Sequence, residues 1–269
     1  MIKRSLKISP LKLVVFGDNG IGKSTFASQA PSPIFIDLED NINHLDVDCI
    51  AATNYRETLN ALNYLLEQKE LKYKTIVIDS FDVLLSRMSL HILDKYVLNS
   101  LEDKYRAGWG LLRDEFKRFL VLVDNIIAHK KVNVIFIAKD THRCVKNSEF
   151  GDYDGIDFRG DLTIAGSLKD WAKAILYLCQ DYRVRQTKEG FSTSKKAVLG
   201  ERIIYTEKSG SIFAKNTYDL EQTIPMNWDY FASKVKEFFA KKINKENNIS
   251  NDNAENFKEQ INVENIGAA

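Results

Sequence analysis

The stretch VVFGDNGIGKSTF, residues 14–26, interrupts an apolar run with three glycines and a lysine. Glycines at positions 17, 20 and 22 would weaken any helix or strand that ran through them. The segment is therefore predicted to be a loop whose backbone comes close to another group. Because an apolar run precedes it and a helical pattern follows it, the loop defines a strand–loop–helix unit.

Composition is that of a soluble globular protein. The 269 residues are 44% hydrophobic, and 38 basic side chains nearly balance 37 acidic ones. This balance argues against a generally polycationic mode of DNA binding, so any nucleic-acid contact must be a local patch. Cys49, Cys144 and Cys179 are widely spaced, which favours neither a disulfide framework nor a zinc site. Without a signal peptide or an apolar run of ~18 residues, we expect a cytoplasmic protein without membrane contact.

Apolar, β-branched runs alternate with helical patterns over the first half of the chain. This alternation predicts an α/β fold with a mostly parallel central sheet flanked by helices. Strands are predicted at residues 11–16, 33–39, 75–80 and 132–138. Helices are predicted at residues 23–30, 55–69, 81–98, 110–130 and 227–243.

The second half of the chain does not show this alternation of apolar runs and helical patterns. Residues 139–161 are polar and glycine-containing, and they predict a long loop. Short strands joined by tight turns are predicted at residues 174–179, 181–187, 201–207 and 211–215, as late antiparallel strands at one edge of the sheet. From about Asn244 the Asn, Glu and Lys content rises. We therefore expect one domain over residues 1–243 and a disordered tail over 244–269 that recruits a protein partner.

The glycine loop matches the phosphate-binding pattern G-x-x-x-x-G-K-[ST], the Walker A motif, and has the required strand before it and helix after it. Backbone N–H groups of such a loop surround a triphosphate. Lys23 would reach the β and γ phosphates, Ser24 would ligate magnesium, and Thr25 would contact the α phosphate. The predicted nucleotide-binding residues are Gly17, Asp18, Asn19, Gly20, Ile21, Gly22, Lys23, Ser24 and Thr25. The alternative is an accidental glycine turn.

Two strand ends offer the acids that such a site needs. The run TIVI delivers Asp79 to a strand end, where it would hold the metal, although it would equally cap the helix that begins at Ser80. The segment FIDLED offers Asp37, Glu39 and Asp40. Strand alternation puts Asp37 and Glu39 on one side, and Glu39 lies nearer the loop. Glu39 is therefore the candidate that orients or deprotonates the attacking water, the alternative being a solvated acid.

The ordered set GDNGIGKST, FIDLED and TIVIDS resembles the RecA-like P-loop ATPases, over about residues 11–240. It is similar more narrowly to phage and prophage ATP-binding proteins related to recombinases that act on single-stranded DNA. The segments GWGLLRDEFKRFL and SGSIFAKNTYDL also look like that group. The resemblance implies a RecA-like P-loop NTPase fold, ATP and Mg²⁺ as cofactors, and a homo-oligomer in the form of a ring or a filament.

The resemblance also implies residues that act outside the loop. Lys215 would reach a neighbouring subunit's γ phosphate, with Lys208 a second candidate, but the usual basic companion is replaced by Thr217. A polar sensor follows the fourth core strand in related enzymes. Here that place holds Lys139, with His142 a little farther on. A surface lysine is an equally good interpretation of Lys139.

Two segments correspond to DNA-contacting loops in the RecA-like comparison, DKYRAGWG and KDTHRCVKNSEF. Both mix cations with aromatic or flexible polar residues, which suits phosphate neutralisation and base stacking. The candidates are Lys104, Arg106, Trp109, Arg143 and Lys146. The alternative is a pair of solvated loops with Trp109 packed beneath its helix, and nearby Asp152, Asp154 and Asp157 would repel phosphate.

The leading hypothesis is a Mg²⁺-dependent ATPase that acts with single-stranded DNA in recombination, annealing or repair. The alternative is a nucleotide-gated scaffold or helicase-loader-like protein with little turnover. The two differ in DNA-stimulated hydrolysis. A small-molecule kinase would need an arginine-rich lid that the sequence lacks, and a GTPase would need an N-K-x-D guanine-reading motif.

Overall fold

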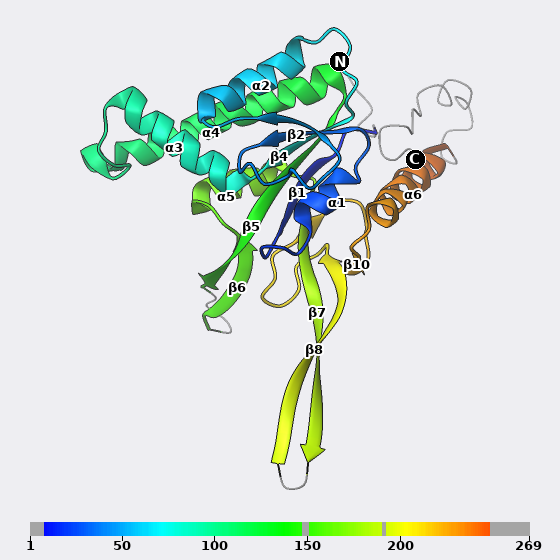
Figure 1. Ribbon diagram of the computed structural model, residues 1–269. Helices are drawn as coiled ribbons and strands as arrows, with labels where there is room; N and C mark the ends of the chain where they lie inside the picture. The colour runs from blue at the N-terminus through cyan, green and yellow to red at the C-terminus, as the bar shows by residue number, and fades with distance from the viewer. Residues whose placement is uncertain (1–7, 147–150, 190–191, 248–269) are drawn as a thin grey trace.

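A mostly parallel sheet forms the centre of the protein (Figure 1). The computed structural model describes residues 8–146, 151–189 and 192–247. The strands are β1 (Lys12–Gly17), β2 (Pro33–Asp37), β3 (Asp48–Ala51), β4 (Thr75–Asp79), β5 (Asn133–Val145), β6 (Tyr153–Phe158), β7 (Ala174–Glu189), β8 (Ser192–Tyr205), β9 (Lys215–Asn216) and β10 (Thr223–Pro225). They follow one another in the order β10-β8-β7-β1-β5-β4-β2-β3, with β6 beside β5 and β9 beside β7.

Helices cover both faces of this sheet (Figure 1). They are α1 (Lys23–Ser28), α2 (Tyr55–Glu67), α3 (Phe81–Tyr96), α4 (Asp103–Lys130), α5 (Leu162–Trp171) and α6 (Trp228–Asn247). Alternate residues of β1 enter two separate cores because side chains alternate along a strand. Val14 and Phe16 pack with helices α2 to α5, whereas Leu13 and Val15 pack with α1 and α6. Burial on both sides explains why the central strands are continuous apolar runs.

The register of the parallel strands brings distant residues to one edge. Asp37 of β2 lies opposite Asp79 of β4, and Asp79 lies opposite Ile137 of β5. On the other side of β5, Gly17 of β1 lies opposite Lys139. The strands β1, β2 and β4 therefore end at the same edge, which is where open α/β sheets bind ligands.

The predicted fold class is confirmed, with parallel strands and crossover helices in the first half and antiparallel strands at one side. The long loop predicted over residues 139–161 is wrong. In its place β5 runs on to Val145 and pairs antiparallel with β6, from Asp140 opposite Phe158 to Val145 opposite Tyr153. The exposed outer part of this hairpin carries polar residues on both faces, which erases the alternation that a half-buried strand would show. Residues 147–150 lie outside the described part.

The late strands also differ from the prediction. Residues 174–187, predicted as two strands, belong to the single long strand β7, and the strand predicted at 211–215 shrinks to β9. The partner β8 begins at Ser192, well before the predicted 201. Together β7 and β8 form a ribbon that extends away from the sheet (Figure 1). The short elements β3, β10 and α5 escaped prediction because few residues carry their pattern.

Helices α4 and α6 have other ends than the predicted ones. Helix α4 begins at Asp103, so residues 103–109 are helical rather than a loop. Helix α6 continues to Asn247; residues 248–269 lie outside the described part, and a disordered tail there stays a prediction.

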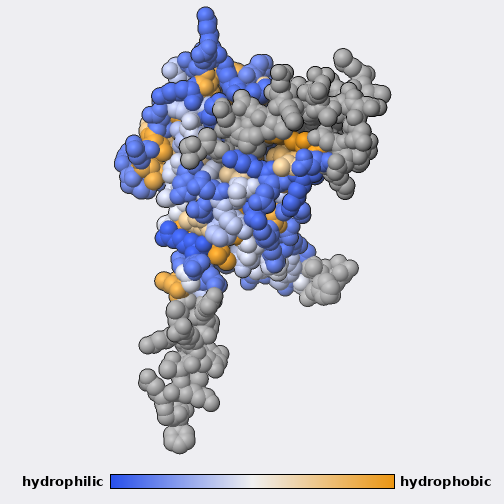
Figure 2. Space-filling model, turned by 90° about the vertical axis from the view of Figure 1, so that its right-hand side faces the viewer, coloured by the Kyte–Doolittle hydropathy of each residue, from blue (hydrophilic) through white to orange (hydrophobic). Residues whose placement is uncertain are grey.

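Among the described helices, none is long and apolar enough to cross a membrane. The face in Figure 2 shows small hydrophobic groups scattered among hydrophilic side chains.

Phe81, at the start of α3, is a central aromatic contact of the core. Its ring centroid lies 5.7 Å from that of Phe116 and 5.6 Å from that of Phe158. We expect Phe81→Ala to lower the free energy of unfolding by about 3–5 kcal/mol, because it opens a cavity between helices and sheet. Urea denaturation would measure this. Tyr64→Ala on the exposed face of α2 is the matched control, and equal losses in both variants would contradict the assigned core.

Candidate active site at the carboxyl edge of the sheet

The glycine loop between β1 and α1 is shaped by close backbone contacts. A Cβ atom at Gly17 would stand 2.3 Å from the carbonyl oxygen of Leu178, on the neighbouring strand β7. Gly22 has φ +105°, and a Cβ atom there would stand 2.9 Å from Cε of Met226. Neither position accepts a side chain without displacing its neighbours. Glycine is therefore required at both positions for the loop to keep this backbone course.

Lys23 folds back over this loop. Its Nζ atom donates hydrogen bonds to the carbonyl oxygens of Gly17 at 2.9 Å and Asp18 at 2.8 Å. Burial lowers the pKa of Lys23, although the charge of Asp79 acts in the opposite direction. An anion beside Lys23 would favour its charged form. The side chain thus lies where a phosphate group would be neutralised.

Ser24 and Asp79 form a direct contact between the loop and β4. The Ser24 hydroxyl donates to Oδ2 of Asp79 at 2.6 Å. Asp79 is 3% exposed, and burial raises its pKa to about 6, helped by the charges of Glu39 and Asp37. The carboxylate is therefore held in a place that disfavours its charge, as expected where a cation supplies the balance.

The donor atoms of this pair fit Mg²⁺. Magnesium prefers oxygen ligands and is commonly held by one or two side chains together with substrate phosphates and water. The described residues contain no group of three or more His, Cys, Asp or Glu that could hold a metal ion without a ligand. Ser24 and Asp79 are the residues that would hold Mg²⁺ together with the phosphates of a bound nucleotide.

Glu39 reaches the same region from a turn. Strand β2 ends at Asp37. The prediction that strand alternation puts Asp37 and Glu39 on the same side is therefore wrong, because Glu39 lies beyond the strand. Instead the buried Asp37 carboxylate accepts hydrogen bonds from the backbone N–H groups of Glu39 and Asp40, each at 3.0 Å. This Asx turn bends the chain after β2 and directs Glu39 toward the loop.

The Glu39 carboxylate is held by three donors. Ser80 donates to it through a short hydrogen bond, Asn41 donates at 3.0 Å, and Nζ of Lys139 lies 2.9 Å away. Burial acts to raise the pKa of Glu39, but the hydrogen bonds from Ser80 and Lys139 outweigh it, and the pKa is lowered. Lys139 also lies 3.6 Å from Asp82. Glu39 is thus an ionised acceptor whose orientation is fixed from both sides.

These residues line one cavity of about 240 Å³, which we call the loop cavity. The predicted residues in its lining are Asn19, Gly20, Gly22, Lys23, Ser24, Thr25, Glu39, Asp79 and Lys139. The sequence interpretation missed Asn41, His44, Ser80 and Ile137. Ser80 had a signal, because it directly follows the predicted metal ligand. Asn41 and His44 had none, since they lie in an irregular segment without a motif.

A second cavity of about 650 Å³, the ribbon cavity, adjoins the first and shares Asn19 and Gly20 with it. Asp18, Ile21 and the candidate sensor His142 line this second cavity instead of the first. It also contains Arg202 of β8, whose Nη1 atom would lie 3.3 Å from a Cβ at Gly22. Arg202 therefore places a cation beside the phosphate loop. Sequence reasoning missed this role although the predicted strand 201–207 contains Arg202, because no motif links this residue to the loop.

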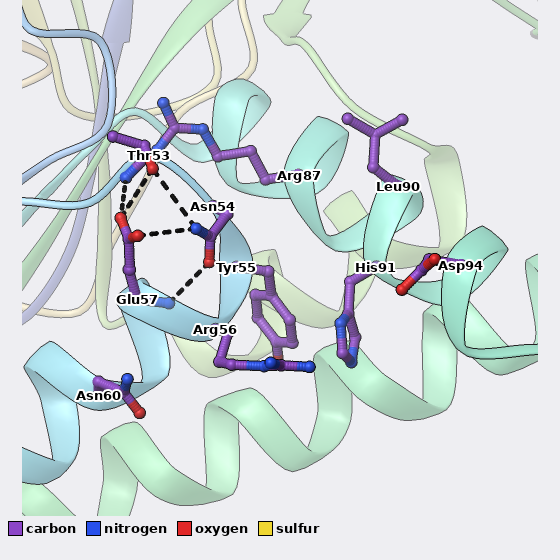
Figure 3. A pocket seen from close by; sticks show the side chains of 10 residues that line it. All are labelled: Thr53, Asn54, Tyr55, Arg56, Glu57, Asn60, Arg87, Leu90, His91 and Asp94. Carbon is purple, nitrogen blue, oxygen red and sulfur yellow. Dashed lines mark hydrogen bonds between the residues drawn. The ribbon is translucent and has the colours of Figure 1, made fainter.

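Arg87 anchors the segment that carries Glu39. From α3 it donates short hydrogen bonds to the carbonyl oxygens of Leu38 and Ala52, at the ends of β2 and β3. Its stem lines a cavity of about 560 Å³ between α2 and α3 (Figure 3). The hydrogen bonds drawn there join Thr53, Asn54 and Glu57, and they form the N-terminal cap of α2. Arg87 thus holds the carbonyl group of Leu38, the residue directly before Glu39.

Lys215 and Lys208 lie away from the loop cavity within one chain. Lys215 belongs to β9, opposite Ile175 near the start of β7, and its Nζ atom donates to the carbonyl oxygen of Lys169 at 2.7 Å. Lys208 lines a separate cavity of about 300 Å³ beside the β5–β6 hairpin. Neither lysine is among the residues that line the loop cavity, so a contact with a neighbouring subunit's nucleotide stays a prediction.

The predicted DNA contacts at the start of α4 are engaged locally. Arg106 pairs with Glu102 at 2.9 Å, and Nε1 of Trp109 donates to the same carboxylate at 2.8 Å. Trp109 also packs against the main core. The side chain of Lys104 lies outside the described part. Arg106 and Trp109 therefore have structural partners that an incoming strand would have to replace.

Of the two DNA contacts predicted after the fourth core strand, Arg143 is hydrogen-bonded within the protein and Lys146 is exposed. Arg143 donates to the carbonyl oxygens of Phe158 at 3.1 Å and Gly160 at 2.6 Å, so it stabilises the β5–β6 hairpin. Lys146 is exposed at the end of β5. Asp157 is buried and paired with Lys169 at 2.6 Å, so its charge is compensated.

Comparisons with known proteins agree with this arrangement at the level of the family. A family model described as an AAA domain matches residues 9–218. A solved structure described as the RadB recombinase aligns with 80% of this chain and 85% of that chain, with a TM-score of 0.44 and 14% identity. At those values the likeness carries nothing about activity. No curated protein matches the chain.

The buried charge of Asp79 gives a stability prediction. A pKa raised from 3.8 to about 6 means that the native state retains a proton which the unfolded chain loses, so stability falls as the pH rises between these values. Asp79→Asn keeps a partner for Ser24 and removes the charge. We expect it to raise the free energy of unfolding at pH 7 by about 1–3 kcal/mol, while removing this pH dependence.

Urea denaturation between pH 4 and pH 7, without nucleotide, would measure the difference between wild type and variant. The exposed Asp46→Asn is the matched control, and its stability should stay within about 0.5 kcal/mol of wild type. A loss of stability in Asp79→Asn at pH 7 would contradict the electrostatic description of this site.

Proposed function

The chain belongs to the AAA domain family. From this premise we propose that it is a RecA-like P-loop ATPase, which binds and hydrolyses ATP with Mg²⁺ while acting with single-stranded DNA in recombination, annealing or repair. One observation carries the proposal: Lys23, Ser24, Glu39 and Asp79 come from separate segments and line a single cavity of about 240 Å³. A relation to phage proteins in particular stays a prediction.

Nucleotide binding would use the loop backbone and Lys23. N–H groups in the first turn of a helix lack partners within that helix, so Lys23, Ser24 and Thr25 can offer theirs to phosphate oxygens. Lys23 would exchange the carbonyl oxygens of Gly17 and Asp18 for the β and γ phosphates. Mg²⁺, when bound, would neutralise charge on the phosphates, and Ser24 and Asp79 are the residues that would hold it.

Hydrolysis would use Glu39 to orient the attacking water. An ionised carboxylate is the right acceptor for a water proton, and the pKa of Glu39 is lowered. Without a nucleotide, Nζ of Lys139 lies 2.9 Å from Oε1 of Glu39 and forms an ion pair with it. A γ phosphate would compete for Lys139, because it offers more negative charge, and would free one Glu39 oxygen for water. Ser80 and Arg87 would keep the carboxylate in position during that exchange.

The oligomer is part of the proposal. Lys215 does not line the loop cavity of its own chain. We propose a homo-oligomer, a ring or a filament, in which Lys215 reaches the γ phosphate of a neighbouring subunit. A location in the cytoplasm and a protein partner for the tail, residues 244–269, stay predictions.

One observation favours the alternative, a nucleotide-gated scaffold or helicase-loader-like protein with little turnover. Glu39 is engaged by Ser80, Asn41 and Lys139 together, so both carboxylate oxygens have a donor and Lys139 must yield before the carboxylate can hold a water. Slow hydrolysis would follow if Lys139 did not yield. DNA-stimulated turnover separates the two functions, since only the first requires it.

The role of Glu39 can be tested by substitution. Glu39→Gln removes the basic acceptor and keeps the shape, so we expect ATP affinity to change little and kcat to fall at least ~100-fold. Lys23→Ala should abolish tight ATP binding, because the phosphate charge loses its partner. Titration with a fluorescent ATP analogue and a phosphate-release assay would measure both. Asp40→Asn, next to Glu39 and exposed, is the control, and normal hydrolysis by Glu39→Gln would disprove the assignment.

The role of Lys215 can be tested by mixing variants. Lys215→Ala retains an intact loop and Lys23→Ala retains an intact Lys215, so a mixed assembly contains some complete sites. We expect each variant alone to be inactive and the mixture to recover part of the wild-type ATPase rate. Thermal denaturation would show that Lys215→Ala is folded despite losing its bond to Lys169. Absence of recovery in mixed assemblies would refute action in trans.

A further inference from the structure

The ribbon cavity lies beside the phosphate loop, at the end of the loop that the nucleoside of ATP does not need. Its lining includes Asp18, Asn19, Gly20 and Ile21 from the first half of the loop. Thr25, the predicted contact of the α phosphate, lines the loop cavity and not the ribbon cavity. The nucleoside is attached to the α phosphate, so it would leave the loop at Thr25. The ribbon cavity, of about 650 Å³, is therefore open to a different ligand.

The base of the β7–β8 ribbon forms one wall of this cavity. Gln180 of β7 lies opposite Arg202 of β8, and Tyr182 is two residues beyond Gln180, so the three side chains share a face. Between the pairs Gln180–Arg202 and Tyr182–Leu199, β7 has one residue and β8 has two, which is the pattern of a β-bulge. A bulge bends its strand and redirects side chains. Gln180, Tyr182 and Arg202 all line the ribbon cavity.

Tyr182 gives the cavity an accessible aromatic ring. Its side chain is 62% exposed although it borders a cavity of the folded protein. Unpaired bases stack on such rings, and the stacking tolerates any sequence because every base has a π face. A duplex keeps its bases stacked within itself and offers none to the ring. The wall thus suits an unpaired base.

Two arginines of the cavity have free guanidinium groups. Arg159, directly after β6, and Arg202 are both exposed, and neither guanidinium group has a hydrogen bond or ion pair with another described residue. The acids of the lining are Asp18 and Asp140, and His142 is its remaining titratable side chain beside them. Two arginines therefore balance two acids, which suits an uncharged base better than a free phosphate. At the exposed rim, the guanidinium groups are accessible to phosphates on either side of such a base.

We propose that the ribbon cavity receives an unpaired base of a single-stranded nucleic acid, which stacks on Tyr182 while Arg159 and Arg202 contact the neighbouring phosphates. This inference rests on the proposed function for the identity of the polymer. It assigns the contact to residues other than Arg106 and Arg143, which are engaged with partners within the protein.

The same cavity connects the strand to the nucleotide. Asn19 and Gly20 line both the ribbon cavity and the loop cavity. Nη1 of Arg202 would lie 3.3 Å from a Cβ atom at Gly22, so this arginine also borders the loop backbone. A strand in the ribbon cavity and a nucleotide in the loop cavity would contact the same short segment from two sides. Each ligand then affects the affinity of the other through that segment, and the effect is reciprocal.

The test is binding of a labelled oligothymidine to the full chain, measured by fluorescence anisotropy over a range of salt concentrations. We expect Tyr182→Ala to weaken binding about 10-fold, and Tyr182→Phe to stay within about 2-fold of wild type because it keeps the ring. Arg159→Gln combined with Arg202→Gln should make the slope of log K against log salt shallower by about 1.4, since each lost phosphate contact removes about 0.7.

Matched controls come from helix α2. Tyr64→Ala removes a tyrosine that is 57% exposed, and Arg56→Gln removes an exposed arginine. Both should bind oligothymidine as wild type does. ATP binding and thermal denaturation of every variant would show that the loop and the fold are intact, and Tyr182→Ala should bind ATP with unchanged affinity.

A second measurement needs no variant. An oligothymidine that carries 5-iododeoxyuridine, irradiated in complex with the wild-type chain, should crosslink to the peptide that contains Tyr182. A crosslink confined to peptides outside the lining of the ribbon cavity would overturn the inference.

The outcomes separate this inference from the proposed function. Equal oligothymidine affinity in wild type and Tyr182→Ala would overturn the inference and leave the proposed function standing. Loss of ATP affinity in Tyr182→Ala would also overturn it, because the cavity would then hold the nucleoside of ATP. Wild type that binds ATP but no single strand would overturn the inference together with the DNA part of the proposed function.

Discussion

A hydrogen bond of 2.6 Å between Ser24 and Asp79 joins the phosphate loop to the end of β4. It exists because β5 separates β1 from β4 in the sheet and holds both in register, so that two segments far apart in sequence end side by side. The bond also holds Asp79 where its negative charge is unfavourable, because this carboxyl group is buried and lies near two further acids, Glu39 and Asp37. A cation bound with a nucleotide would compensate that charge, and the remaining residues of the loop cavity are arranged around Asp79.

The second acid is placed by contacts that are independent of the metal ligand. Asp37 bends the chain after β2, Arg87 holds the carbonyl oxygen of Leu38, and Lys139 and Ser80 fix the Glu39 carboxylate. Lys139 directly follows the buried part of β5, next to β1 and β4 in the sheet. Its ammonium group is therefore the contact through which the presence of a γ phosphate would be transmitted to Glu39.

The fold class and the loop were predictable because both depend on local, one-dimensional signals. Continuous apolar runs require burial on both faces, and a glycine at position 22 requires a backbone that other residues avoid. Asp79 was predictable because an apolar strand ends with it. Glu39 lies in the predicted place for a different reason, since its position depends on a side-chain hydrogen bond from Asp37 rather than on the pleat of β2.

What the sequence did not predict lies where both faces of an element are exposed or where a side chain's partner is set by the folded structure. The outer part of β5–β6 carries polar residues on both faces, and the sequence of residues 182–199 is also mostly polar, so periodicity does not distinguish strand from loop there. Arg106 and Arg143 resembled free cations, but the structure pairs them with Glu102 and with the carbonyl oxygens of Phe158 and Gly160. Arg87 and Arg202 have no motif, because their roles depend on tertiary contacts alone.

The most direct test of the central claim is a calorimetric titration of the full wild-type chain with ATP, once in Mg²⁺ and once in EDTA. If Ser24 and Asp79 hold a nucleotide-bound cation beside Lys23, the chain will bind ATP at one site, and chelating Mg²⁺ will weaken binding on the order of tenfold or more, because the buried Asp79 carboxylate then faces the phosphates without a cation. Absence of ATP binding, or an affinity that EDTA leaves unchanged, would contradict the account.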